Sequence, residues 1–271
     1  KQKIFEANNN DIENAKKSNL DDAFIDRLEL NKKNITSMTE GLRQTESLDD
    51  LIGEITNIRQ MNSGIQVGKM RVPLGVIGMI YESRPNVTID AAALAIKSGN
   101  AIILRGGSES LASNNYLATL ILESLKVASL PNGSVQIIKT KDRAAVTKLI
   151  QMNNFVDVII PRGGKGLVKK ITDEATIPVI KHLDGNCHMF VDEDADMGMA
   201  LELIDNAKTQ RLGTCNTLES LIISNSIAKS LLPRIKAVFD SKKIEMRVCE
   251  NSLKIITNAK KASDQDFYEE Y

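Results

Sequence analysis

The feature that most constrains the fold of this sequence is an alternation of short apolar runs and helical patterns between residues 75 and 161. The run GVIGMIYE (75–82) is typical of a buried strand, and TIDAAALAIKSG (88–99) of a helix that ends on glycine. A second apolar run, NAIILRG (100–106), completes a strand, helix, strand unit. We therefore predict one βαβ unit here, with its two strands parallel.

The same alternation continues beyond this unit. The sequence predicts two further helices and two further strands, in the order helix 115–128, strand 134–139, helix 142–152 and strand 156–161. Repetition of this kind is typical of a parallel sheet that carries helices on both faces. The predicted fold class is therefore α/β, with a doubly wound parallel sheet.

The two ends of the chain have a different pattern. Residues 1–59 are rich in charge and carry apolar residues at amphipathic helical spacing, which predicts peripheral helices. Beyond residue 192 the sequence predicts only two or three strands and two helices, among them a helix at 195–210 and a strand at 218–224. These are too few elements for a complete sheet domain. We place the domains at 1–191 and 192–271, and expect the second to be incomplete.

Composition excludes several classes of partner. Hydrophobic residues make up 42% of the chain and charged residues 26%, as in soluble globular proteins. Thirty-five basic residues balance 35 acidic ones, so no net charge favours nucleic acid or an anionic membrane surface. The longest apolar run, 72–81, is too short to span a bilayer. Three cysteines form no disulfide framework, which predicts a reducing compartment, the cytoplasm.

One cysteine lies in a context that suits chemistry. Cys215 belongs to the polar stretch TQRLGTCN (209–216), which is predicted to form a turn, with Lys208 and Arg211 close in sequence to favour the thiolate. The alternative is a small buried residue with a packing role only. Two other cysteines lie in strand-like segments and are predicted to pack there: Cys187 and Cys249. No set of residues has the number and spacing of ligands that a metal site needs.

Two glycine-rich turns follow predicted strands, where ligands of open α/β sheets bind. The first is RGGSE (105–109), and the second is PRGGKG (161–166), whose spacing matches neither a dinucleotide fingerprint nor a phosphate loop. Asn86, between a strand and a helix, can present an amide donor at the same edge of the sheet. The alternatives are ordinary tight turns for the glycines and a helix cap for Asn86.

Four segments together carry a specific resemblance. They are VPLGVIGMIYESRPNVTIDAAALAIKSGNAIILRGGSES (72–110), IPRGGKGL (160–167), HLDGNCHMFVD (182–192) and NAKTQRLGTCNTLESLII (206–223). In this order and spacing the chain resembles the gamma-glutamyl phosphate reductase family of the aldehyde dehydrogenase superfamily. The resemblance implies an aldehyde dehydrogenase-like fold, in which a doubly wound cofactor domain is followed by an α/β catalytic domain.

The resemblance also implies an enzyme. Members of the family reduce L-glutamyl 5-phosphate to L-glutamate 5-semialdehyde with NADPH and release phosphate, a step of proline biosynthesis. Cys215 matches the family's nucleophile, which forms a thioester, and Asn86 matches its oxyanion donor, together with the backbone N–H of Cys215. Arg84 and Lys208 flank these segments and are candidates to contact anionic groups of the substrate. The alternative for both is a solvated surface role.

The implied cofactor site lies in the first domain. Arg105, Ser108 and Glu109 match the turn that holds the adenosine ribose, and a cationic Arg105 suits a 2′-phosphate and hence NADPH. Gly163 and Gly164 match the turn near the pyrophosphate. The family also implies a homo-oligomer and a functional pairing with glutamate 5-kinase.

Two other hypotheses stay open. The first is a truncated, catalytically inactive fragment that binds nucleotide. The second is a cysteine hydrolase or acyltransferase in which His182 or His188 pairs with Cys215. The stretch HLDGN (182–186) lacks the glutamate with which hydrolytic superfamily members activate water, and this difference favours a reductase.

Overall fold

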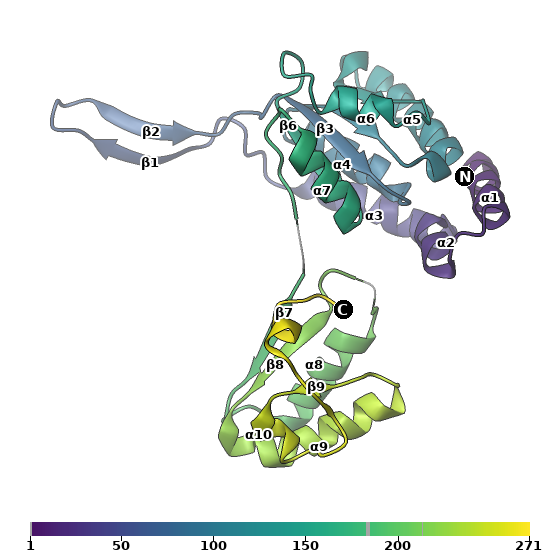
Figure 1. Cartoon of the computed structure of the whole chain (residues 1–271). Helices are drawn as coiled ribbons and strands as arrows, with labels where there is room; N and C mark the ends of the chain where they lie inside the picture. The colour runs from purple at the N-terminus through teal and green to yellow at the C-terminus, as the bar shows by residue number, and fades with distance from the viewer. Residues whose placement is uncertain (1, 183–184, 213) are drawn as a thin grey trace. The chain divides into compact units, whose positions relative to one another are not determined.

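The chain folds into two compact units, Lys1–His182 and Leu183–Tyr271 (Figure 1). The computed structural model describes three stretches of the chain: 2–182, 185–212 and 214–271. The division falls before β7 (Cys187–Val191), a strand that the sequence analysis assigned to the first domain. β7 pairs in parallel with β8 (Leu218–Ile223), and this pairing places it in the second unit.

A four-stranded parallel sheet forms the centre of the first unit, in the order β5-β4-β3-β6. Its strands along the chain are β3 (Val76–Tyr81), β4 (Ala101–Arg105), β5 (Val135–Ile137) and β6 (Val158–Arg162). A helix follows each of them: α4 (Asn86–Lys97), α5 (Leu111–Val127), α6 (Ala144–Leu149) and α7 (Lys165–Glu174). The predicted α/β class and parallel, doubly wound sheet are confirmed.

Two apolar clusters cover the two faces of this sheet. Ile77 and Tyr81 of β3 pack with buried residues of α4 and α5, whereas Ile80 packs with those of α6 and α7. Successive side chains of a strand point to opposite faces, which explains the division. Gly78 lies on the α6 and α7 face, where a Cβ would lie 2.5 Å from Ile159 Cδ1, so a side chain there would require Ile159 to move.

Three helices precede the sheet, as residues 1–59 predicted: α1 (Gln2–Lys17), α2 (Asp22–Leu28) and α3 (Lys32–Ser47). The buried Asp11 of α1 connects this helix to the start of α5 by hydrogen bonds. It accepts the main-chain N–H groups of Ala112 at 3.1 Å and Ser113 at 2.7 Å. These bonds satisfy two of the free N–H groups that begin α5.

An antiparallel hairpin that the sequence analysis did not predict follows these helices. Its strands, β1 (Ile55–Gln60) and β2 (Gln66–Met70), project from the first unit in Figure 1. Ile52, Ile55 and Ile58 recur every three residues, a spacing that indicates a helix. All three are exposed, Ile52 in the turn before the hairpin and the other two in β1. Because neither face of the hairpin is buried by its own unit, the alternation that marks a half-buried strand is missing.

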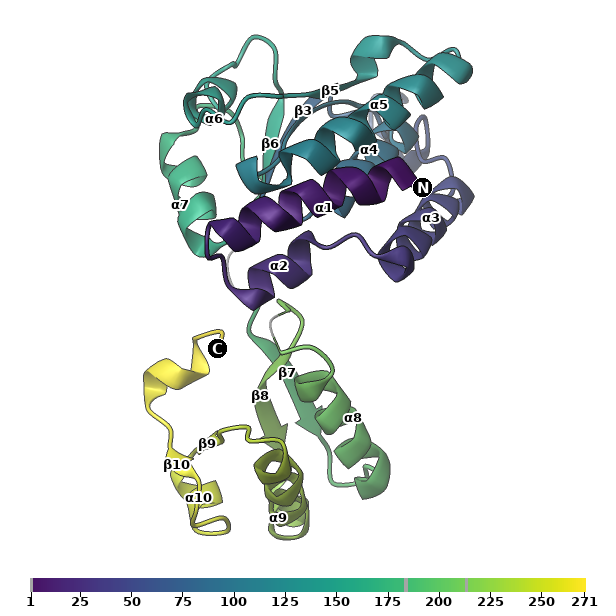
Figure 2. The same cartoon turned by 90° about the vertical axis from the view of Figure 1, so that its right-hand side faces the viewer.

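The second unit is built on the β7–β8 pair. Figure 2 shows α8 (Met197–Thr209) and α9 (Asn225–Ser241) beside this pair, and the shared core includes the fully buried Ile204, Leu231 and Ile235. Four short elements follow in the order β9 (Arg247–Val248), α10 (Glu250–Leu253), β10 (Lys260–Lys261) and a 3-10 turn (Asp264–Phe267). Among the described residues of both units, no helix is long and apolar enough to cross a membrane.

Candidate active site

The strand order of the first sheet reverses between β3 and β6, and open α/β sheets bind ligands at the carboxyl ends of such a pair. Here the Glu82 carboxylate accepts the Gly164 N–H, with Oε2 2.9 Å from the nitrogen, at the start of α7. A Cβ on Gly163 would lie 2.5 Å from Glu82 Oε2 and 2.7 Å from Leu167 Cδ2. The loop after β3 and the glycine turn after β6 therefore lie in contact, and a side chain at 163 would require the ends of Glu82 and Leu167 to move.

A second contact joins the loops that follow β3 and β4. Glu109 Oε1 accepts the N–H and the hydroxyl of Ser83, at 3.0 and 3.1 Å, and Ser108 Oγ donates to Glu109 Oε2 at 3.3 Å. Ser83 is 4% exposed and has a φ of 42°, a left-handed conformation that residues with a side chain seldom adopt. Glu109 holds Ser83 in this conformation.

Arg105, the last residue of β4, is only 6% exposed. Its two Nη atoms donate to the main-chain carbonyls of Gly106 and Lys141, while Nε has no partner among the described residues. A buried donor without an acceptor costs about 1–3 kcal/mol. An anionic ligand at this turn would supply the missing acceptor, so the residues present fit a phosphate-bearing cofactor.

A chain of buried hydrogen bonds lies beneath the same turn. The Tyr81 hydroxyl lies 2.7 Å from Thr88 Oγ1, Thr88 donates to Asn114 Oδ1 at 3.0 Å, and Asn114 Nδ2 donates to Ser110 Oγ at 2.9 Å. Burial raises the pKa of Tyr81 to about 12. A Cβ on Gly106 would overlap Asn114 Nδ2 and lie 3.1 Å from the Tyr81 ring, so this glycine lets the main chain rest directly on the network.

Asn86 is the first residue of α4, and the preceding Pro85 is the N-cap, without a side-chain cap bond. The Asn86 amide Nδ2 donates to Asp90 Oδ2 at 3.1 Å, one helical turn further on. Burial raises the pKa of the half-buried Asp90. An ionised carboxylate only accepts hydrogen bonds, so Asp90 keeps the NH₂ side of the amide toward itself. The second N–H of Asn86 has no acceptor in the described part of the chain. Arg84 is half-buried in the loop before α4.

In the second unit, Cys215 lies exposed in the turn between α8 and β8. The buried Thr217 holds this turn, because its hydroxyl donates to the Arg211 carbonyl at 2.9 Å. Lys208 forms an ion pair with Glu219 at 3.0 Å, and their side chains are only 16% and 4% exposed. Glu219 therefore neutralises the charge of Lys208 within the unit, and a contact of Lys208 with substrate stays a prediction.

Gly185 and Cys187, just before and at the start of β7, pack against the main chain of Cys215. A Cβ on Gly185 would overlap the Cys215 carbonyl oxygen and lie 2.8 Å from its carbonyl carbon. Cys187, expected to pack only, has its Sγ 3.5 Å from the same carbonyl oxygen. His188 Nδ1 lies 2.7 Å from the Asn186 carbonyl. Among the described residues of the second unit, the His188 ring has no bond to Cys215, and a Cys-His pair stays a prediction.

The structure thus groups the predicted cofactor residues and Asn86 at one edge of the first sheet. In the second unit it places Lys208 at the end of α8 and Cys215 in the turn that follows. Sequence analysis missed Glu82, Asp90 and Asn114. Asp90 carried a usable signal, since residues four apart on a helix are neighbours. Glu82 and Asn114 meet their partners only through the tertiary fold. In the HLDGN stretch, Leu183 and Asp184 lie outside the described residues.

Comparison with known proteins identifies relatives along most of the chain. A model of the aldehyde dehydrogenase family matches residues 16–263. The gamma-glutamyl phosphate reductase of Thermotoga maritima is 42% identical, with a TM-score of 0.90 over 100% of this chain and 65% of its own. That of Saccharomyces cerevisiae is 32% identical, with a TM-score of 0.62 over 95% of this chain and 67% of its own.

A more distant structure shares the fold. An engineered glycolyl-CoA reductase with bound NADP⁺ is 18% identical, with a TM-score of 0.56 over 83% of this chain and 54% of its own. The resemblance deduced from the four sequence segments is confirmed. The present chain spans 65% of the length of the Thermotoga reductase, just under two thirds.

Proposed function

The chain belongs to the aldehyde dehydrogenase family, and from this premise we propose that it reduces L-glutamyl 5-phosphate to L-glutamate 5-semialdehyde, with release of phosphate, in proline biosynthesis. The observation that carries the proposal is the 42% identity, over the whole of this chain, to a gamma-glutamyl phosphate reductase. The exposed thiol in a turn of fixed main chain and the glycine turns at one sheet edge support it.

Cys215 is the proposed nucleophile. Its thiolate attacks the acyl carbon, and the tetrahedral adduct collapses with cleavage of the bond between that carbon and the phosphate oxygen, which leaves a thioester. The Asn86 amide and the Cys215 backbone N–H are the proposed donors to the oxyanion. One such donor is typically worth about 2.7–4 kcal/mol. After reduction, the thiohemiacetal oxyanion re-forms a carbonyl, the C–S bond breaks, and the thiolate is regenerated.

The proposed cofactor is NADPH, which when bound supplies a hydride to the thioester carbon. Arg105, Ser108 and Glu109 would hold its adenosine ribose and 2′-phosphate, and the unpartnered Nε of the buried Arg105 supports this assignment. Gly163 and Gly164 would lie near its pyrophosphate. Glu82 occupies the Gly164 N–H in this structure, so binding there requires Glu82 to give up that hydrogen bond.

The test is an assay of the reverse reaction, the phosphate-dependent reduction of NADP⁺ by glutamate 5-semialdehyde, with Cys215→Ala as the control. Turnover that the variant loses supports the reductase. NADPH binding without turnover by either protein would favour the second candidate, an inactive nucleotide-binding fragment, because the chain spans 65% of a related reductase. Cofactor-independent hydrolysis of acyl esters would contradict both.

The proposed assembly is a homo-oligomer in the cytoplasm. The β1–β2 hairpin supports the oligomer, because a two-stranded sheet with exposed apolar side chains is marginal alone and gains stability when a partner covers it. The three free cysteines are consistent with a reducing compartment. Arg84 as a substrate contact and a functional pairing with glutamate 5-kinase stay predictions.

A further inference from the structure

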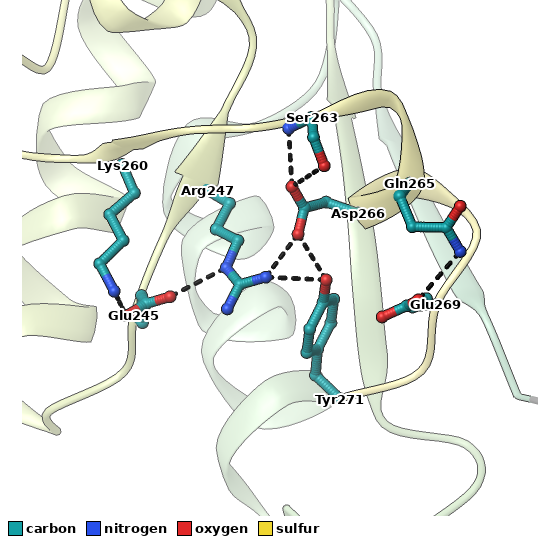
Figure 3. Close-up of polar contacts among 8 residues, drawn as sticks. All are labelled: Glu245, Arg247, Lys260, Ser263, Gln265, Asp266, Glu269 and Tyr271. Atoms are coloured by element: carbon teal, nitrogen blue, oxygen red, sulfur yellow. Dashed lines mark hydrogen bonds and ion pairs between the residues drawn. The ribbon is translucent and has the colours of Figure 1, made fainter.

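Arg247 holds one segment of the second unit at two points (Figure 3). Its Nη1 donates to the Asp266 carboxylate and, at 2.8 Å, to the Tyr271 hydroxyl, and its guanidinium carbon lies 4.5 Å from the centre of the Tyr271 ring. Its Nε donates to Glu245 at 2.9 Å, which fixes the other side of the guanidinium. Arg247 therefore fastens both ends of the stretch 266–271 to β9.

The Asp266 carboxylate is the most heavily bonded group of this arrangement. Besides Arg247 it accepts the N–H and the hydroxyl of Ser263, both at 2.6 Å, and the Tyr271 hydroxyl. The bond from the Ser263 side chain, followed by the bond from Tyr271, holds the pKa of Asp266 well below its usual range. Asp266 is therefore ionised at neutral pH, and its bond to Arg247 is charge-assisted.

Between Asp266 and Tyr271, the 266–271 segment contacts the two residues that precede β7. The Phe267 carbonyl accepts Asn186 Nδ2 at 2.7 Å, and Glu270 Oε2 accepts the Gly185 N–H at 3.0 Å. Asn186 Oδ1 in turn accepts the Ser220 hydroxyl of β8 at 3.2 Å. Two consecutive residues, Gly185 and Asn186, are therefore held by a segment whose own ends are fixed by Arg247.

Gly185 is the residue that packs on the Cys215 carbonyl without room for a side chain. We propose that Arg247 is a positioning residue for Cys215: it fixes the 266–271 segment, the segment fixes Gly185 and Asn186, and these fix the peptide that carries the thiol. The inference rests on the proposed function only for the role of Cys215 as nucleophile, because the chain of contacts itself does not involve catalysis.

The test compares Arg247→Met with the unmodified chain by amide hydrogen exchange and by kinetics. We expect exchange about ten-fold faster, or more, in peptides that contain residues 185–188 and Cys215, with α9 unchanged. In the assay, kcat should fall about ten-fold while KM for NADP⁺ stays the same, because the thiol is displaced and the cofactor turns are not. Arg247→Lys keeps the charge but not the planar guanidinium with its several donors. Its exchange rate and its kcat should therefore lie between those of Arg247→Met and the unmodified chain.

The matched control is Lys261→Met. Lys261 lies on β10, the strand paired with β9, and the substitution removes only its exposed ion pair with Glu250 (2.6 Å), so both readouts should stay unchanged. Faster exchange in 263–271 alone, with the Cys215 peptide unchanged, would overturn the inference. If Arg247→Met also speeds exchange in α9, the milder substitution Tyr271→Phe is measured instead. The inference then depends on whether exchange rises in the peptides that contain 185–188 and Cys215. Hydrogen exchange needs no turnover, so an inactive wild-type chain would contradict the proposed function and leave this inference to be decided on its own.

Discussion

The main chain at Gly185 lies directly against the main chain at Cys215, and the substitution of Gly185 by alanine tests this contact. Gly185→Ala places a Cβ on the Cys215 carbonyl, so one of the two segments must move. Overpacking of this kind typically costs about 1–3 kcal/mol, and we expect a loss of this size in urea unfolding followed on the second unit.

The matched control is Gly166→Ala in α7, where nothing lies within 4 Å of the new Cβ. Replacement of glycine by alanine at an unstrained site stabilises by about 0.4–1 kcal/mol. Equal effects of the two substitutions would mean that the contact at 185 carries no special cost.

The Asn86–Asp90 pair gives a kinetic prediction. Asn86→Ala should lower kcat about 10²–10³-fold if the amide stabilises an oxyanion. Asp90→Ala should lower kcat by less, because it removes the acceptor that orients the amide and not the donor itself. The two effects should not add in the double variant, since Asp90 acts through Asn86. Additive losses, or a rise in KM for the substrate with Asp90→Ala alone, would instead assign Asp90 a direct substrate contact.

Tyr81 makes stability depend on alkaline pH. Its pKa is raised from 10.0 to about 12 by burial, so the neutral hydroxyl is favoured in the folded state. This contribution is fully present below pH 10 and is lost as the pH rises to 12, a difference of about 3 kcal/mol for two pKa units. Urea unfolding at pH 8 and pH 11.5 measures it. Tyr81→Phe, which cannot ionise, should lose less between these pH values, and an equal loss would exclude Tyr81 as the cause.

Candidate residues in locally distinctive segments could be singled out from the sequence, and residues whose partners are distant along the chain could not. Cys215 and Asn86 lie in segments whose polarity and flanking patterns mark them without a structure. By contrast, Glu82 meets Gly164 at a separation of 82 residues, and Arg247 meets Tyr271 at 24. Lys208 was selected because it lies close in sequence to Cys215. The structure shows that it forms an ion pair with the buried side chain of Glu219, a structural role that the sequence did not indicate.

At the scale of elements, the strands β3, β4 and β6 of the first sheet were predictable because they are largely buried and consist mostly of apolar residues. The β1–β2 hairpin was not, since its side chains are exposed and follow a helical spacing. The observed division of the chain falls before 183, whereas the sequence analysis placed it after 191, and the difference arises from the strand β7. β7 is half-exposed and short, and only its pairing with β8 assigns it to the second unit.

The hairpin carries the prediction for assembly. If its exposed apolar residues are covered by a second copy, Ile58→Glu should shift the chain to smaller species in light scattering after size exclusion, because a charge would be buried at the contact. Arg59→Glu, an exposed charge on the same strand, is the control and should leave a contact built on apolar side chains intact. The same mass for all three proteins would place any oligomer contact elsewhere.

At the scale of the whole molecule, each unit has its own apolar clusters and its own part of the candidate site. The predicted cofactor residues all belong to the first unit, so NADPH should stabilise that unit without any need for the second. A ligand that binds only the folded state at 100 times its Kd adds about 2.7 kcal/mol. We therefore expect NADPH to raise the unfolding midpoint reported by a probe in the first unit.

Arg105 makes this prediction specific to the 2′-phosphate. The buried Nε of Arg105 has no acceptor in the described part of the chain, so Arg105→Met should relieve the cost of this unpaired donor in the free chain. It should also remove the charge that favours NADPH. The stabilisation by NADPH should then shrink while that by NADH stays as it was. Loss of both to the same extent would mean that Arg105 supports the glycine turn as a whole, and an unchanged response to NADPH would move the phosphate contact to another residue.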